Sequence, residues 1–175
     1  MKLRHLFVVL FLMIVLSGCS KEEAVDAKGK CTVAECMEMV DVDNSVADIN
    51  EIIGVDGVLV DAGYNEYYWE ISEDTGIYVT YYDTDVGEIR VEIPDELIAS
   101  RKLSFAKINE IETLVNDEDS LDYQKLVDML GDVEGVLIEK NTDSLTYKWV
   151  DNDNKYLNAT FSRDTGKCIM LTGMY

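Results

Sequence analysis

A helix followed by short strands occurs twice in this chain, and this pattern limits the folds that it can adopt. Residues 45–54 match residues 122–131 at an offset of 77, with apolar residues on apolar residues and a glycine ending each block. The match continues where Gly57-Val-Leu-Val resembles Gly135-Val-Leu-Ile. Because the offset drifts only from 77 to 80 over the later landmarks, the sequence predicts an internal duplication.

Each half has the periodicity of helices and then of strands. Apolar residues spaced by three predict a first helix at about 33–40 and at about 105–115. A second helix then follows Ser45 or Asp122, which are plausible N-caps because their side chains can accept a hydrogen bond from the first turn. The period next changes to two, and the predicted strands are 58–63, 66–72, 76–83, 87–93, 135–140, 144–150, 155–162 and 166–172.

These elements predict an α+β fold with two tandem repeats. In each repeat, a helix-loop-helix packs on one face of a four-stranded antiparallel sheet. The predicted boundaries are 31–93 for the first repeat, 94–102 for a linker that contains the only proline, and 103–175 for the second repeat.

Alternation along the strands separates a predicted core side from a second side. The core side carries Trp69, Ile71, Ile77, Val79, Tyr81, Ile89, Val91, Ile93, Tyr147, Trp149, Leu157, Ala159, Phe161, Cys168 and Met170. Tyrosine is enriched at recognition surfaces, so the second side is a candidate binding surface. The alternative is that its tyrosine and threonine pairs only stabilise a solvated sheet. The predicted partner-binding residues are Tyr68, Tyr78, Tyr82, Lys148, Tyr156, Ile169 and Leu171.

The N-terminus resembles the signal of a bacterial lipoprotein. Lys2 and Arg4 precede a charge-free apolar run over 6–16, which is too short to span a bilayer as a helix. Leu16, Ser17, Gly18 and Cys19 then resemble a lipobox. This resemblance implies a signal peptide at 1–18, acylation of Cys19, and a flexible tether at 19–30. It implies a protein that is anchored by acyl chains, including palmitate, on the outer side of the cell membrane.

The negative charge of the chain and its single histidine exclude several functions. The chain has 35 acidic and 15 basic residues and a formal charge of −20, which disfavours nucleic acid as a partner. Its one histidine, His5, lies in the predicted signal peptide, so no histidine-dependent catalytic triad is available. The segment 151–155 begins like a calcium loop, but its sixth position is not glycine, and a hairpin turn explains it better. We therefore predict no catalytic residues, no metal and no cofactor.

Three cysteines remain after Cys19, which permits one internal disulfide at most. Cys31 and Cys36 would lie about 140° apart on a regular helix, so they can form a disulfide only if Cys31 precedes the helix. A bond between Cys36 and Cys168 is a second possibility. A buried, free Cys168 is the third.

Several motifs together resemble the β-lactamase inhibitor protein fold. These are the lipobox, Gly131-Asp132 after a helix, Tyr147-Lys-Trp149, and the Thr165-Gly-Lys167 turn. The resemblance covers nearly all of 31–175 and implies two units whose sheets together grip a partner protein. We expect a non-catalytic lipoprotein that binds an extracytoplasmic protein. The alternatives are a structural or assembly lipoprotein of the envelope, an inhibitor of an extracellular enzyme, and a hydrolase that uses carboxylates.

Overall fold

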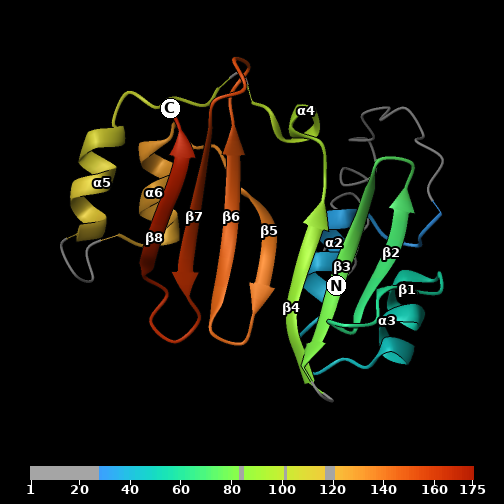
Figure 1. Cartoon of the computed structure of the whole chain (residues 1–175). Coiled ribbons are helices and arrows are strands. Elements are labelled where there is room, and N and C mark those ends of the chain that lie inside the picture. Colours follow the sequence, from blue (N-terminus) through green and yellow to red (C-terminus); the bar gives the residue numbers. More distant parts are fainter. Residues whose placement is uncertain (1–27, 83–84, 101, 117–120) are drawn as a thin grey trace, which may run out of the picture.

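A single antiparallel sheet of eight strands forms the centre of the molecule (Figure 1). The structure, a computed structural model, describes residues 28–82, 85–100, 102–116 and 121–175. Each strand pairs with its neighbours in sequence order. The strands are β1 (Val58–Asp61), β2 (Glu66–Ser72), β3 (Thr75–Tyr82), β4 (Asp85–Glu92), β5 (Val136–Asn141), β6 (Ser144–Val150), β7 (Tyr156–Ser162) and β8 (Cys168–Met174).

Tight turns connect several of these strands. Asn65, Asn154 and Gly166 have positive φ angles of 51°, 58° and 70°, which asparagine and glycine adopt at low cost. In the turn between β6 and β7, Asp151 Oδ1 accepts hydrogen bonds from the backbone N–H groups of Asp153 and Lys155. The predicted hairpin turn at 151–155 is confirmed.

Short helices lie beside the sheet, with α2, α3 and α6 behind it in the view of Figure 1. The predicted N-caps are confirmed, since the side chains of Ser45 and Asp122 accept hydrogen bonds from the N–H groups of Asp48 and Lys125. The helices are α2 (Val33–Met39), α3 (Val46–Ile53), α4 (Asp95–Ile98), α5 (Ile108–Asn116) and α6 (Tyr123–Met129).

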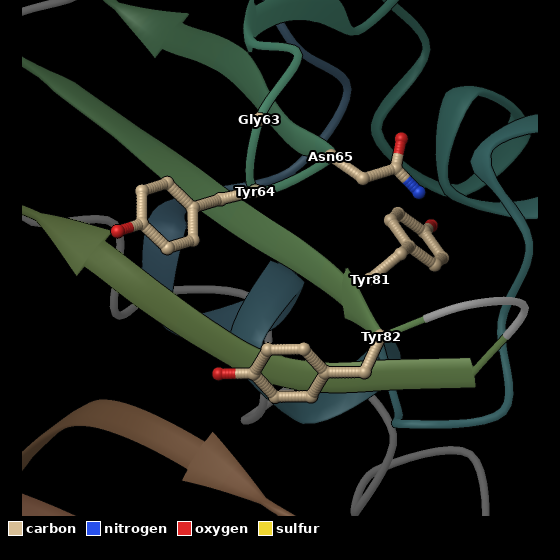
Figure 2. Close-up of a pocket in the computed structure, with 5 residues that line it drawn as sticks. All are labelled: Gly63, Tyr64, Asn65, Tyr81 and Tyr82. Atoms are coloured by element: carbon tan, nitrogen blue, oxygen red, sulfur yellow. The ribbon is translucent and has the colours of Figure 1, made fainter.

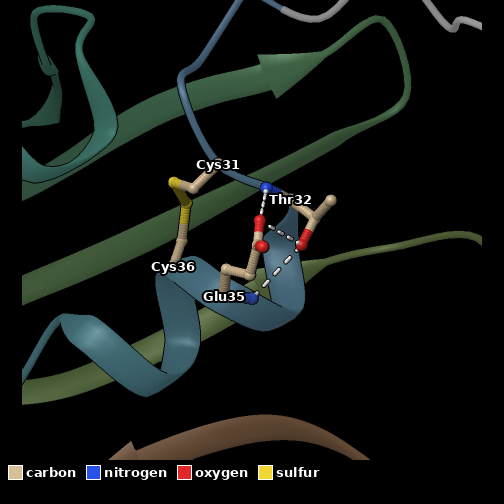
Figure 3. Close-up of a disulfide and its surroundings, with 4 residues drawn as sticks. All are labelled: Cys31, Thr32, Glu35 and Cys36. Atoms are coloured by element: carbon tan, nitrogen blue, oxygen red, sulfur yellow. Dashed lines mark hydrogen bonds between the residues drawn. A yellow bond between two sulfur atoms is a disulfide. The ribbon is translucent and has the colours of Figure 1, made fainter. Parts of the chain in front are cut away.

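A disulfide links Cys31 to Cys36 at the start of α2 (Figure 3). Cys31 precedes the N-cap Thr32, so it is not constrained by helix geometry, which was the condition for this pairing. Thr32 and Glu35 form a capping box beside the disulfide. Cys168 is free and buried, and burial raises the pKa of its thiol to about 11. The alternative bond between Cys36 and Cys168 is wrong.

Two apolar clusters fill the space between the helices and the sheet. Each is centred on a tryptophan: Trp69 is 0% exposed and Trp149 is 1% exposed. Gly57 and Gly135 lie directly against these two rings, and a Cβ atom at either position would overlap the indole. The core side predicted from alternation is confirmed as buried for Trp69, Ile71, Ile77, Val79, Tyr81, Ile89, Trp149, Leu157, Ala159, Phe161 and Cys168.

The predicted fold class of two repeats, each with its own four-stranded sheet, is wrong. The eight strands form one continuous sheet, accompanied by five short helices in the described residues. The two halves join where β4 pairs with β5, through Glu88 with Asn141, Ile89 with Lys140 and Arg90 with Glu139. This pairing satisfies backbone groups that two separate sheets would leave at open edges.

Polar contacts behind the sheet reinforce this junction. Lys140 is 6% exposed, and its Nζ donates a 2.7 Å hydrogen bond to the carbonyl oxygen of Val40, which caps α2. Arg163, in the turn between β7 and β8, pairs with Asp41 at 3.4 Å and donates to the Asn141 carbonyl at 3.0 Å. Side chains of the second half therefore hold the α2–α3 loop of the first.

The described chain begins close to one end of the sheet. The backbone N–H groups of Lys28 and Gly29 donate to the Ile71 carbonyl, and that of Lys30 donates to Ile53. The last three residues of the predicted tether, 28–30, therefore form backbone hydrogen bonds with the fold. The predicted signal peptide, its motif Leu16, Ser17 and Gly18, and the acylation site Cys19 lie outside the described residues. Among the described helices, none combines the length and apolarity needed to cross a bilayer.

Candidate functional site

The face of the sheet opposite the main helices carries one row of side chains in lateral register across all eight strands. We call these residues the transverse row. Because neighbouring strands lie about 4.8 Å apart, the row extends over roughly 34 Å. Its members, from β1 to β8, are Val58, Tyr68, Tyr78, Arg90, Glu139, Thr146, Thr160 and Met170.

Two tyrosines form the aromatic part of the row. The rings of Tyr68 and Tyr78 lie 4.6 Å apart between centroids. Gly76 makes room for this pair, because a Cβ atom there would come 2.5 Å from the Tyr68 ring. Burial, and then the hydrogen bond to Glu92, raise the pKa of the Tyr68 phenol well above its usual value. Both phenols are therefore neutral donors on this face at physiological pH.

The centre of the face holds more acids than cations. Arg90 pairs with Glu66 and, at 2.7 Å, with Glu88, while its guanidinium lies 5.1 Å from the centre of the Tyr78 ring. Glu139 faces Arg90 across the junction of β4 and β5. Burial, and then repulsion from Glu88, raise the pKa of the Glu139 carboxyl, although Arg90 opposes this shift. The centre therefore has a surplus of negative charge at neutral pH.

The second half of the face carries buried threonines and the cation Lys148. Thr146 and Thr160 are 8% and 7% exposed, and their hydroxyls lie 3.1 Å apart. Lys148 forms a 2.5 Å ion pair with Asp95 of α4 and lies 5.3 Å from the centre of the Tyr156 ring. In the transverse row, the two threonines lie between Glu139 and Met170.

The predicted partner-binding residues do not form one cluster. The structure brings Tyr68 together with Tyr78, and Lys148 together with Tyr156. Tyr82 is 63% exposed at the far end of β3. Ile169 is 58% exposed at a bulge near the start of β8.

The prediction that Leu171 lies on the open face is wrong. The pairs Phe161–Cys168 and Thr160–Met170 leave Ile169 as an extra residue, so the alternation of β8 shifts by one. Leu171 pairs with Ala159 and packs against the second apolar cluster. Met170, which was predicted on the core side, instead belongs to the transverse row and is 51% exposed.

A shallow hollow lies between the β1–β2 turn and the end of β3 (Figure 2). It encloses about 480 Å³ and is lined by Gly63, Tyr64, Asn65, Tyr81 and Tyr82. Tyr81 is held by a hydrogen bond from its hydroxyl to the Asn44 carbonyl, whereas Tyr64 is 71% exposed. The lining carries aromatic rings and one amide but no carboxylate, so it offers stacking rather than acid–base chemistry.

Sequence reasoning did not identify Glu139, because a bulge in β5 reverses its orientation. The pairs Leu137–Tyr147 and Glu139–Thr146 leave Ile138 as the extra residue. Glu139 therefore lies on the open face, and Lys140 points toward the helices. The alternation of β5 alone predicts the reverse. Within the described residues, no group of three or more His, Cys, Asp or Glu side chains is placed to hold a metal ion.

The raised pKa of Glu139 leads to a pH-dependent prediction. A carboxyl whose pKa is higher in the folded state contributes stability that decreases as the pH rises through that pKa. We expect Glu139→Gln to raise the melting temperature by about 1–3 °C at about pH 7, since partly exposed charges contribute well under 1 kcal/mol. Below the ordinary glutamate pKa of about 4.3 the difference should disappear. Thermal unfolding of both proteins at several pH values measures this.

The exposed Glu134, just before β5, provides the control. Glu134→Gln should change the melting temperature by a similarly small amount at about pH 7 and below about pH 4.3. A Glu139→Gln variant that is less stable than the wild type at neutral pH would contradict the argument.

Comparison with known proteins adds no family assignment. No family model matches the chain, and a search of curated proteins found no matching relative. The resemblance to the β-lactamase inhibitor proteins remains a prediction from the quoted motifs.

Proposed function

We propose that this protein is a non-catalytic lipoprotein that holds an extracytoplasmic protein against the open face of its sheet. The observation that carries the proposal is the transverse row, which places two tyrosines in ring contact, an arginine, a glutamate and two threonines on one continuous surface. Tyrosine and arginine are the residues that most often dominate protein–protein binding energy.

The charge of the face supports a basic partner. The cations described at this face are already engaged, Lys28 by Glu70, Arg90 by Glu66 and Glu88, and Lys148 by Asp95. Glu139 forms no ion pair within the described residues, and Glu92 interacts with tyrosine hydroxyls. Lysine or arginine side chains of a partner would compensate these carboxylates. Association should therefore weaken as the ionic strength rises.

The N-terminal motif supports the location. Acylation at Cys19 would anchor the chain, and the described part begins beside Ile71, at one end of β2. Because the mature chain has no histidine, the proposal assigns the face to binding rather than to catalysis.

Affinity capture from envelope extracts tests the proposal. The bait is the chain without residues 1–18 and with Cys19→Ser, either otherwise unchanged or with Tyr78→Ala and Tyr156→Ala. We expect the double variant to recover at least about tenfold less of a specific partner, because hot-spot tyrosines contribute more than 1 kcal/mol each. Recovery by the unchanged bait should fall at high ionic strength.

Tyr175→Ala is the matched control, because this tyrosine is also partly exposed but contacts Glu112 and Phe105 of the α5 region instead. The control should recover the partner as the unchanged bait does. Equal recovery of every protein by the double variant would refute the assignment of the open face. Melting temperatures of all baits show whether any loss comes from unfolding.

A further inference from the structure

The outer strand β1 presents an exposed apolar edge. Val58, Leu59 and Val60 are 62%, 46% and 49% exposed in succession. β1 pairs with β2 on one side and is the first strand in the sheet order, so its other side has no partner strand among the described residues (Figure 1). Natural edge strands are protected by lysine, proline, a covering element, a bulge or short length. β1 is only four residues long and has a bulge between Leu59 and Asp61, but its three exposed residues include no charge and no proline.

The protein itself shows what such an edge can accept. β5 begins like β1, with Gly-Val-Leu, and in both segments the glycine lies against a buried tryptophan. The outer side of β5 accepts β4 near the end of β5, where Glu139, Lys140 and Asn141 pair antiparallel with β4. β1 begins with the same residues and has no neighbouring strand on its outer side among the described residues. An antiparallel strand is therefore the shape that fits this edge.

Charge indicates the chemistry of that strand. Asp56 lies just before β1 and Asp61 at its end, so a carboxylate flanks the apolar residues on each side. Asp56 accepts a hydrogen bond from Asn50, and Asp61 accepts from the N–H groups of Gly63 and Tyr64, but neither forms an ion pair in the described part of the chain. Two copies of this edge would bring these acids together. A strand with lysine or arginine at its ends would compensate them.

We propose that β1 is a docking edge for an extended segment of a partner protein. The segment would add as a ninth, antiparallel strand, apolar in the middle and basic at both ends. Main-chain hydrogen bonds would provide affinity, and contacts with Val58 and Val60 would provide selectivity. This proposal does not depend on the tyrosines of the open face, although the edge adjoins that face at Val58.

NMR titration with a defined peptide tests the proposal. The probe is an acetylated and amidated peptide in which valine and threonine alternate between terminal lysines. We expect it to shift the amide resonances of residues 58–60 and to slow their hydrogen exchange by at least about tenfold. Methylating alternate backbone nitrogens of the peptide on its pairing edge should abolish both effects, since this removes the donors that a strand needs.

Two variants separate the edge from general surface binding. Val58→Lys with Val60→Lys should weaken binding by at least about tenfold, because lysine is a natural edge protector. Met174→Lys, at a comparably exposed site on the other edge strand, should leave binding within about twofold. Unchanged melting temperatures confirm that both variants fold.

The remaining outcomes contradict the proposal. Shifts confined to the transverse row would place the peptide on the open face instead. Protection of residues 58–60 that increases with protein concentration, without peptide, would make a second copy the occupant. Protection that disappears on deleting residues 20–27 would make the chain's own N-terminal segment the occupant. In affinity capture, equal recovery by the Tyr78→Ala and Tyr156→Ala bait would refute the assignment of the open face, but it would not bear on the assignment of this edge.

Discussion

Replacing Trp149 by alanine is expected to lower the free energy of unfolding by about 3–5 kcal/mol, the usual cost of removing a large aromatic side chain from a core. The ring is 1% exposed, and its Nε1 donates a 2.8 Å hydrogen bond to the Val133 carbonyl. Tyr123 and Tyr147 pack around it, with ring centroids at 6.0 and 6.3 Å. Alanine would leave a cavity and an unpaired carbonyl. Urea unfolding followed by circular dichroism measures the loss.

The first half provides an independent repeat of this measurement. Trp69 is 0% exposed, and its Nε1 donates to Asn50 Oδ1 at 2.8 Å. Trp69→Ala should therefore cost a similar amount. Trp149→Phe and Trp69→Phe, which retain most of the ring, should cost clearly less than the alanine variants. A loss below about 1 kcal/mol for either alanine variant would mean that the ring is not a core residue.

Replacing Lys140 by alanine is expected to cost about 2–4 kcal/mol. The variant removes buried methylene groups, worth about 0.8 kcal/mol each, and leaves the buried Val40 carbonyl without its donor, which costs about 1–3 kcal/mol. Relief of the buried charge offsets part of this loss, since desolvation lowers the pKa of Lys140. The same unfolding measurement applies.

Two further variants separate these contributions. Lys140→Met retains the apolar stem and loses only the donor, so its cost should be about 1–2 kcal/mol. Lys155→Ala, at an exposed lysine in the β6–β7 turn, should stay within about 0.5 kcal/mol of the wild type. If Lys140→Ala resembled Lys155→Ala, the contact with α2 would not stabilise the junction of β4 and β5.

Most strands and their core-facing residues could be predicted from the sequence. Residues 66–72 and 144–150 were predicted with the bounds that the structure shows, because their alternation is uninterrupted. The caps Ser45 and Asp122 were also predictable, since a cap depends only on residues within one helical turn. The disulfide partner of Cys31 could not be predicted, because the distance between Cys31 and Cys36 depends on where the helix begins.

The candidate site was less predictable because bulges interrupt two of its strands. Alternation assumes that every residue has one partner across the ladder. Ile138 and Ile169 each break this assumption, so Glu139 and Met170 reach the open face while Lys140 and Leu171 leave it. A bulge depends on both strands of a pair, so the period of one strand does not reveal it.

Local pattern alone determined the helices, the strands and the two buried tryptophans, because each depends on spacing between residues close in the chain. Only the tertiary structure decided that β4 and β5 pair, turning two expected sheets into one. The energy of that contact comes from backbone groups, from Lys140 at α2 and from Arg163 at Asp41, segments that are distant in sequence. The alternation of apolar residues along β4 or β5 does not indicate which strand will pair with its outer edge.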